Sequence, residues 1–225
     1  PFLYYPLLLE GLAEAKAAGF LTGVVTNAYF AESEEDALIW LEPLAALGVG
    51  DLSVSDDEFH HSGTDDTPGS RAVRAARRLG IPVGTICVEG EGVRYRGRAA
   101  ERLVDGLSLR PPGSFRECPD EDLGDPGRVH IDAYGNVHLC QGVLMGNIKN
   151  KPLKQLLDAW DPAADPISGP ILSGGPAALA KVYGCANGQR FASACHLCYS
   201  VRKQLVDRYP GSLGPPSVYG SGNGS

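Results

Sequence analysis

Residues 129–160 read VHIDAYGNVHLCQGVLMGNIKNKPLKQLLDAW, and this stretch decides how the second half of the chain folds. Two runs that suit strands, Arg128 to Ala133 and Asn136 to Cys140, flank the turn-forming pair Tyr134-Gly135. We therefore expect a β-hairpin that presents the cysteine at the end of its return strand.

Four of the six cysteines have a spacing that suits a shared metal site. Between Cys118 and Cys140 lie 21 residues, a further 54 precede Cys195, and Cys195 and Cys198 form a Cys-x2-Cys pair. Such a pair can share one metal, while a hairpin cysteine and a loop cysteine complete a tetrahedral thiolate site. Four thiolates suit either Zn²⁺ or an iron-sulfur cluster, and spacing alone does not choose between them.

The first half of the chain alternates helical and strand patterns. Helices are expected at 7–18, 34–48, 68–79 and 98–104, and strands at 20–27, 52–55, 81–88 and 93–97. The first of these strands, Phe20 to Asn27, should be buried on both faces. Strands that alternate with helices predict βαβ units, so the fold class is α/β with a parallel sheet.

The alternation of helical and strand patterns ends after Leu109, and this change predicts two domains. The stretch RPPGS at 110–114 is typical of a linker, and few helical patterns follow it except at Leu153 to Trp160 and Ala194 to Tyr209. We expect a first domain at 1–108, a second at 109–209 and a disordered tail at 210–225.

Composition excludes several classes of protein. A net charge of −7 disfavours a nucleic-acid partner, because phosphate binding needs a basic face. No apolar run approaches the ~18 residues of a membrane-spanning helix, so no membrane partner is expected. Cysteine usage of this kind is typical of metal or redox chemistry in a reducing compartment, and we expect a cytoplasmic protein.

The stretch 129–160 resembles the SPASM and twitch extensions of radical SAM enzymes, which bind auxiliary [4Fe-4S] clusters. The resemblance rests on Gly135-x4-Cys140, on Gly146-Asn147-Ile148, and on Pro152-Leu153 opening a helix that ends in Trp160. In the twitch form an upstream cysteine, the cysteine of Gly-x4-Cys and a distant Cys-x2-Cys bind one cluster. These correspond here to Cys118, Cys140, Cys195 and Cys198.

Two cysteines remain outside this set. Cys87 falls in an apolar strand and suits a buried thiol. Cys185 is an alternative to Cys118 as the fourth ligand. The cysteines that follow the pair in a two-cluster SPASM domain are absent from this sequence, so the resemblance implies a single auxiliary cluster.

The first half is similar to the barrel of the same family. Pro1 falls where the Gly-Gly-Glu-Pro end of the second barrel strand would lie, and residues 84–91 resemble the fifth-strand G-x-I-x-G-x-x-E motif. The resemblance implies a partial radical SAM (β/α)6 barrel, with the Cys-x3-Cys-x2-Cys motif of the catalytic [4Fe-4S] cluster in a segment before Pro1. The positions that correspond to S-adenosyl-L-methionine contacts are Thr26, Asn27, Ser53, Ser55, Gly84, Ile86, Val88 and Glu91.

The function implied by this resemblance is hydrogen abstraction by a 5′-deoxyadenosyl radical, with the auxiliary cluster as an electron relay. The implied substrate is a peptide or protein, or a small molecule that is oxidised, and the implied electron donor is a flavodoxin or ferredoxin. The alternative is a non-enzymatic four-cysteine zinc-binding module on an α/β domain.

Arginines and histidines near these motifs are further candidates. Arg94, Arg96 and Arg98 alternate along the expected strand at 93–97, where a guanidinium could hold a carboxylate. His130 and His138 suit the hairpin surface. His196 lies within the Cys-x2-Cys pair, and we expect it to donate to a thiolate sulfur.

The 225 residues should not cleave S-adenosyl-L-methionine, because the three-cysteine motif that holds the catalytic cluster is not among them. The expected yield of 5′-deoxyadenosine from reconstituted protein, S-adenosyl-L-methionine and dithionite equals that of a protein-free control. Clear turnover in this assay would contradict the resemblance.

Overall fold

The computed structural model describes residues 1–56, 66–86 and 93–220. The chain divides into two compact units, Pro1–Gly92 and Val93–Ser225. The division between the units comes before the boundary expected near residue 108. The physical reason is that the segment after Val93 packs with the second unit, where Ala100 belongs to the hydrophobic core.

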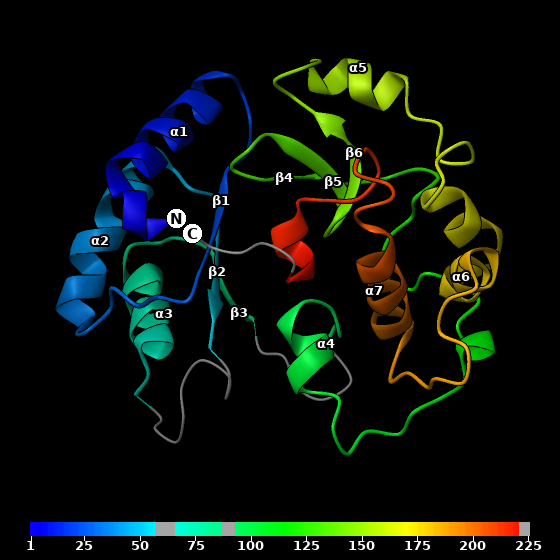
Figure 1. Cartoon of the computed structure of the whole chain (residues 1–225). Coiled ribbons are helices and arrows are strands. Elements are labelled where there is room, and N and C mark those ends of the chain that lie inside the picture. Colours follow the sequence, from blue (N-terminus) through cyan, green and yellow to red (C-terminus); the bar gives the residue numbers. More distant parts are fainter. Residues whose placement is uncertain (57–65, 87–92, 221–225) are drawn as a thin grey trace. The chain divides into compact units, whose positions relative to one another are not determined.

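The first unit is a three-stranded parallel sheet with helices on one face (Figure 1). Its elements are η1 (Phe2–Tyr4), α1 (Tyr5–Ala17), β1 (Gly23–Thr26), α2 (Glu34–Leu47), β2 (Asp51–Ser55), α3 (Pro68–Arg78) and β3 (Val83–Ile86). The strand order β1-β2-β3 makes α2 and α3 the crossovers of two βαβ units. The predicted α/β class with a parallel sheet is confirmed. The described residues form no closed barrel, so the radical SAM barrel stays a prediction.

The sheet of the first unit buries only one of its faces. Val24, Leu52 and Val54 are buried in a core shared with α2 and α3. Val25 points the other way and is 56% exposed. The expectation that Phe20 to Asn27 is buried on both faces is therefore wrong, because the helices of this unit cover a single face of the sheet.

Side-chain caps define where two of these helices begin. Ser33 Oγ accepts the Asp36 N–H at 3.0 Å, which starts α2 at the predicted N-cap. Thr67 and Ser70 form a reciprocal capping box at the start of α3. The polar side chains at these positions therefore determine the residues at which α2 and α3 begin.

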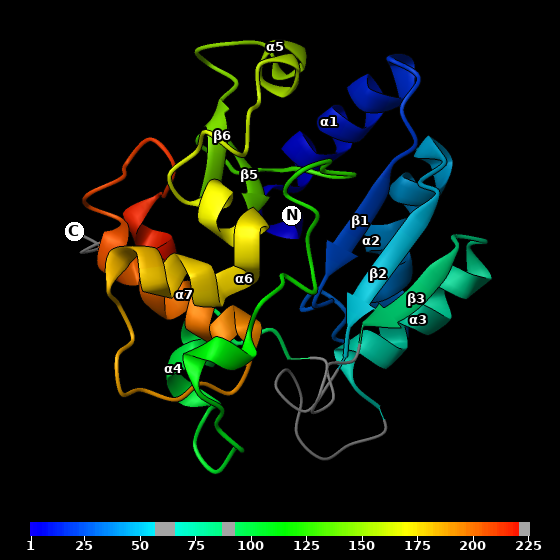
Figure 2. The same cartoon turned by 90° about the vertical axis from the view of Figure 1, so that its right-hand side faces the viewer.

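The second unit combines an antiparallel sheet with helices. Its elements are α4 (Arg98–Arg102), η3 (Pro112–Ser114), β4 (His130–Ile131), β5 (Asn136–Cys140), β6 (Val143–Asn147), α5 (Leu153–Asp158), α6 (Ser168–Tyr183), α7 (Ala194–Leu205) and η4 (Pro216–Tyr219). The sheet order is β4-β5-β6, and α6 packs against α7 (Figure 2). The expected hairpin is confirmed, with His130 paired to His138 and Ile131 to Val137. The expected strand at Val93 to Gly97 is wrong, since residues 93–97 form no strand.

The segment that follows α7 is ordered through residue 220. Leu213 forms a β-bridge with Val143 and is 1% exposed, while Tyr219 is fully buried. The expectation of a disordered tail is wrong for residues 210–220, because these two side chains anchor the segment in the core of the unit. Residues 221–225 lie outside the described part of the chain.

Within the described ranges, none of the helices combines the length and the apolar character needed to span a membrane.

The outer edge of β1 should promote self-association. The structure pairs β1 only with β2 among the described strands, and an unpaired apolar strand can pair with another chain. We expect the protein to self-associate in sedimentation velocity, and Val25→Lys to reduce the association because it places a charge beside the open edge. Ile39→Lys, which charges an exposed position on α2, should leave the association unchanged. A monomeric native protein would contradict this account.

Candidate metal centre

The four predicted cysteine ligands line one cavity of the second unit. Cys118 comes from the loop after η3, Cys140 ends β5, and Cys195 and Cys198 lie in the first turns of α7. All four are free thiols. Cys185 does not line this cavity, and its Sγ lies 3.7 Å from the carbonyl oxygen of Tyr183. The structure thus brings together the set that contains Cys118 rather than Cys185.

The cavity between the thiols is small in this conformation. The room for the centre of a water molecule is about 20 Å³, enough for little more than one water. Among the described residues, no three His, Cys, Asp or Glu side chains are arranged to hold a metal ion. The sulfur donors therefore share a cavity without converging on a point. Four soft sulfur donors are the set that zinc and iron-sulfur clusters require, so the chemistry of the residues fits either group.

Cys140 is positioned by a network inside the hairpin. Asp132 Oδ1 accepts the N–H groups of Tyr134 and Asn136, each at 2.9 Å, and thereby closes the turn. Its Oδ2 accepts Nε2–H of the buried His138 at 3.1 Å. The Nδ1 atom of that histidine accepts the Gly142 N–H at 3.2 Å, which fixes the tautomer. The expectation that His138 lies on the hairpin surface is wrong, because its ring ties the turn to the loop after Cys140.

Asp132 stays ionised far into the acid range. Burial alone would raise the pKa of Asp132. Hydrogen bonds from the side chains of Asn136 and His138 and from the backbone N–H groups of Asn136 and Tyr134 outweigh burial and lower the pKa to about 2. The carboxylate therefore stabilises the hairpin above its ordinary pKa of 3.8. This stabilisation is lost as the pH falls from there toward about 2.

Cys118 is positioned by close packing of its segment on α6. The helical conformation of α6 is interrupted at Gly174 and Gly175. A Cβ at Gly175, where φ is +67°, would overlap the backbone that joins Arg116 to Glu117. Only glycine combines this φ with this close approach, so Gly175 lets the chain before Cys118 reach the cavity.

Cys195 and Cys198 are positioned by the start of α7. Ser193 caps the helix by accepting the His196 N–H at 3.2 Å. The three-residue spacing puts both thiols on one face of the helix. The N-terminal end of a helix dipole favours negative charge, which helps these thiols to become thiolates when a metal binds.

A buried arginine lies on the inner side of this cavity. Arg202 of α7 lines the cavity and is 1% exposed. Its Nη1 donates to the Gln141 carbonyl oxygen at 2.8 Å and to Tyr219 Oη at 3.1 Å, and its Nε donates to the Cys198 carbonyl oxygen at 3.3 Å. The ion pairs found among the described residues do not include this guanidinium.

The charge of Arg202 calls for an anionic neighbour. A guanidinium keeps its charge in proteins, and although burial lowers the pKa of Arg202, the ionised forms of Cys198, Tyr219 and Cys140 would raise it by more. An uncompensated buried charge costs several kcal/mol. Thiolates in the adjoining cavity would offset that cost, and neutral thiols would not.

Two more arginines and a carboxylate surround the cysteines. Arg96 Nη1 donates to Cys140 Sγ at 3.0 Å. Arg94 Nε lies 3.0 Å from Asp120 Oδ1, and Asp120 Oδ2 accepts the S–H of Cys195 at 2.8 Å. Positive charge thus approaches the cavity from two separate segments of the second unit.

Burial also governs the protonation of the thiols. Burial and then the hydrogen bond to Asp120 raise the pKa of Cys195 far above its ordinary value, and burial raises the pKa of Cys198. These thiols therefore stay protonated at neutral pH until a metal displaces their protons.

The predicted contacts of S-adenosyl-L-methionine that the structure describes lie along or directly after the three strands of the first unit, with Ser53 and Gly84 in mid-strand. Thr26 ends β1, Ser55 pairs with Ile86, and Ser53 pairs with Gly84. Ser53 and Ser55 alternate with the buried residues of β2, so they share the sheet face opposite α2 and α3. Asn27 follows β1 and is exposed, whereas Val88 and Glu91 lie outside the described residues.

The side chain of Thr26 makes a hydrogen bond to the backbone of the turn that follows β1. Its Oγ1 accepts the N–H of Ala28 at 3.0 Å, and Ala28 has a positive φ of 54°. The hydroxyl thus supports a tight turn directly after β1. Thr26 is 5% exposed and shares the buried face of β1 with Val24.

Sequence reasoning singled out Arg94 and Arg96 but missed two other charged residues beside the cysteines, Arg202 and Asp120. Arg202 follows Cys198 by four positions, so helical spacing alone would have put it on the same face of α7. No local signal marks Asp120. Among the described residues His196 makes no hydrogen bond to a cysteine sulfur; its Nδ1 accepts the Ala192 N–H and its ring packs against Phe191, so its donation to a thiolate stays a prediction.

A scan against models of known protein families gives no match to this chain, and a search of curated proteins gives none either. The case for a function therefore depends on the residues and geometry described above.

Asp132→Asn should destabilise the second unit at neutral pH. The new amide would turn an N–H₂ group toward Asn136 or His138, and loss of charge-assisted hydrogen bonds costs about 1–3 kcal/mol. The free energy of unfolding, measured by urea titration, should fall at pH 7, and the difference from the native protein should shrink as the pH drops below 3.8.

Asp161→Asn is a matched control for this change. Among the residues that the structure describes, Asp161 accepts the backbone N–H groups of Ala163 and Ala164 alone, and an amide oxygen can also accept these. A pH-independent loss at Asp132, or equal losses at both positions, would contradict the role of the Asp132 carboxylate.

Proposed function

We propose that the second unit binds one auxiliary [4Fe-4S] cluster through Cys118, Cys140, Cys195 and Cys198, as part of a radical SAM enzyme. The observation that carries this proposal is the meeting of four cysteines from three distant parts of the sequence at one cavity, beside the buried charge of Arg202. A tetrathiolate centre is anionic and would neutralise that charge.

Zinc is the second candidate, and one observation favours it. The room between the thiols suits little more than one water, so a cluster would require the cysteine side chains to move further outward than a single ion would. The sequence favours the cluster, because Gly135-x4-Cys140, Gly146-Asn147-Ile148 and the distant Cys-x2-Cys resemble a twitch domain. A zinc-loaded chain would be a non-enzymatic four-cysteine module.

The residues of the chain have separate roles in this proposal. An iron-sulfur cluster supplies one-electron transfer, with a potential set by hydrogen bonds and burial around its sulfur ligands. Four thiolates would leave no iron open to substrate. Arg96 would donate a hydrogen bond to the Cys140 sulfur. Arg202, which also lines the cavity, would balance the negative charge of the four thiolates. The chain would thus hold an electron relay rather than a substrate-binding iron.

In this proposal the first unit binds S-adenosyl-L-methionine. Its contacts with S-adenosyl-L-methionine would come from Thr26, Asn27, Ser53, Ser55, Gly84 and Ile86, together with Val88 and Glu91. The intact enzyme would act on a peptide, a protein or a small molecule, with a flavodoxin or ferredoxin as electron donor, in the cytoplasm.

Metal analysis after anaerobic reconstitution separates the two candidates. With iron and sulfide supplied, we expect four irons per chain and the brown colour of a cluster. One zinc per chain, retained in competition with iron, would contradict the cluster and favour the zinc-binding module. A chain that retains neither metal would contradict the metal centre altogether.

Single Cys→Ala variants test the ligand set. Alanine at Cys118, Cys140, Cys195 or Cys198 should each remove most of the bound metal, because each takes away one of four donors. Cys185→Ala is the matched control and should retain it. Metal loss in Cys185→Ala together with retention in Cys118→Ala would reassign the fourth ligand.

A further inference from the structure

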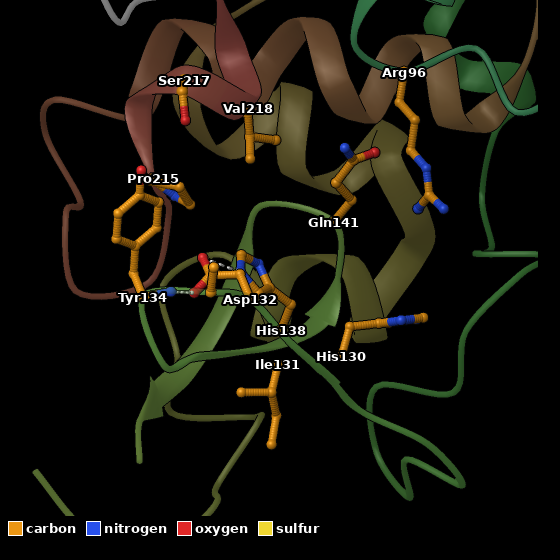
Figure 3. A pocket seen from close by; sticks show the side chains of 11 residues that line it. Arg96, His130, Ile131, Asp132, Tyr134, His138, Gln141, Pro215, Ser217 and Val218 are labelled. Carbon is orange, nitrogen blue, oxygen red and sulfur yellow. Dashed lines mark hydrogen bonds and ion pairs between the residues drawn. The ribbon is translucent and has the colours of Figure 1, made fainter. Parts of the chain in front are cut away.

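A second cavity of the second unit lies against the hairpin. It has a volume of about 550 Å³, within the range of ~300–1,000 Å³ typical of small-molecule sites. Figure 3 shows Arg96 and Gln141 at one end of this pocket and Tyr134 and Pro215 at the other. Arg96 also lines the cysteine cavity, so the two cavities share this residue.

Two of the polar groups in the pocket are already occupied. Asp132 accepts four hydrogen bonds within the hairpin. Both ring nitrogens of His138 are used, one toward Asp132 and the other toward the Gly142 N–H. These groups form a fixed wall and have little capacity left for a ligand.

Arg96 has donors to spare. Its only side-chain partner among the described residues is Cys140 Sγ, through Nη1. Arg94, two residues earlier, pairs with Asp120, whereas the described ion pairs do not include Arg96. A guanidinium has five N–H donors and binds carboxylates in a planar, two-point geometry.

The other end of the pocket is largely apolar. Tyr134 is 68% exposed and Ile131 is 46% exposed. Pro215 and Val218 also line the pocket, together with the hydroxyl-bearing Ser217 beside Pro215 (Figure 3). Exposed aromatic and aliphatic side chains around a concave site suit an apolar group of a ligand. A ligand that fits both ends has a carboxylate at one end and an apolar or aromatic body at the other.

We propose that this pocket binds a carboxylate with an apolar body, held by Arg96 at its charged end and by Tyr134 at its apolar end. The carboxylate could belong to a small organic acid or to the C-terminal residue of a peptide. The binding itself does not depend on the metal; its interpretation as the substrate site next to the cysteine centre rests on the proposed function.

NMR titration of the ¹⁵N-labelled full chain tests the proposal. The probes are N-acetyl-phenylalanine and its uncharged amide, both with chelator present so that the result does not depend on bound metal. We expect the acid to shift the hairpin signals and to bind at least about tenfold more tightly than the amide, because the amide cannot accept charge-assisted hydrogen bonds from the guanidinium. Equal binding of acid and amide, or no binding of the acid, would overturn the proposal.

Variants locate the charged contact. Arg96→Gln should weaken binding of the acid at least about tenfold, and Arg96→Lys should weaken it less, since lysine keeps the charge but loses the two-point geometry. Arg102→Gln removes an equal charge at an exposed position on α4 that does not line the pocket, and it should bind as the native protein does. Tyr134→Ala should weaken binding of N-acetyl-phenylalanine more than binding of acetate. Native-like affinity in Arg96→Gln would overturn the assignment.

A second pair of probes separates the two sources of the carboxylate. N-acetyl-Gly-Gly-Phe as the free acid should bind more tightly than N-acetyl-phenylalanine if peptide C-termini are the natural ligands, and equally if small acids are. Either result supports the carboxylate site. The two proposals can fail separately. If the chain binds the carboxylate probe but retains neither iron nor zinc in the reconstitution experiment, the pocket is supported and the proposed function is refuted.

Discussion

Arg202 carries a positive charge into the interior of the second unit, and the arrangement of the surrounding residues follows from the need to offset it. The guanidinium is 1% exposed, and within the described part of the chain it donates to two carbonyl oxygens and a tyrosine hydroxyl. These dipoles satisfy its donors but do not neutralise its charge. Four thiols line the cavity on its other side, and thiolates bound to a metal would supply the missing negative charge.

The same guanidinium joins three segments that are distant in the sequence. It contacts the loop after β5 through Gln141, the chain of α7 through Cys198, and η4 through Tyr219. Tyr219 Oη in turn donates to the Gly142 carbonyl oxygen at 2.8 Å, and a Cβ at Gly142 would lie 2.5 Å from that hydroxyl oxygen. Loss of the Arg202 side chain would therefore disturb the loop that positions Cys140 as well as the charge balance of the cavity.

Local patterns in the sequence predicted the elements whose stability is local. The crossovers of the first unit follow from apolar periodicity and from the caps at Ser33 and Thr67, and the hairpin follows from its turn. The spacing of Cys118, Cys140, Cys195 and Cys198 singled out four cysteines that line one cavity, and their binding of a metal stays a prediction. The barrel that the family resemblance implies is not seen in the described residues, where the sheet has three parallel strands.

Features that depend on distant contacts were missed. The 210–220 segment is rich in glycine, proline and serine, yet Leu213 and Tyr219 anchor it through contacts with β6 and α7. Alternating arginines suggested a strand at 93–97, but Arg94 and Arg96 instead reach Asp120 and Cys140. β6 and α6 were not predicted. α6 contains a break at Gly174 and Gly175 that obscures its helical period, and the break serves the approach of the Cys118 segment.

X-ray absorption at the metal edge of the loaded full chain tests the central claim most directly, because it counts the atoms bound to the metal. The account predicts a first shell made of sulfur alone, four sulfur atoms around each metal, at about 2.3 Å for either zinc or iron. Cluster formation would add iron–iron scattering to that shell. A first shell that contains nitrogen or oxygen atoms, or fewer than four sulfur atoms, would contradict the four-cysteine centre.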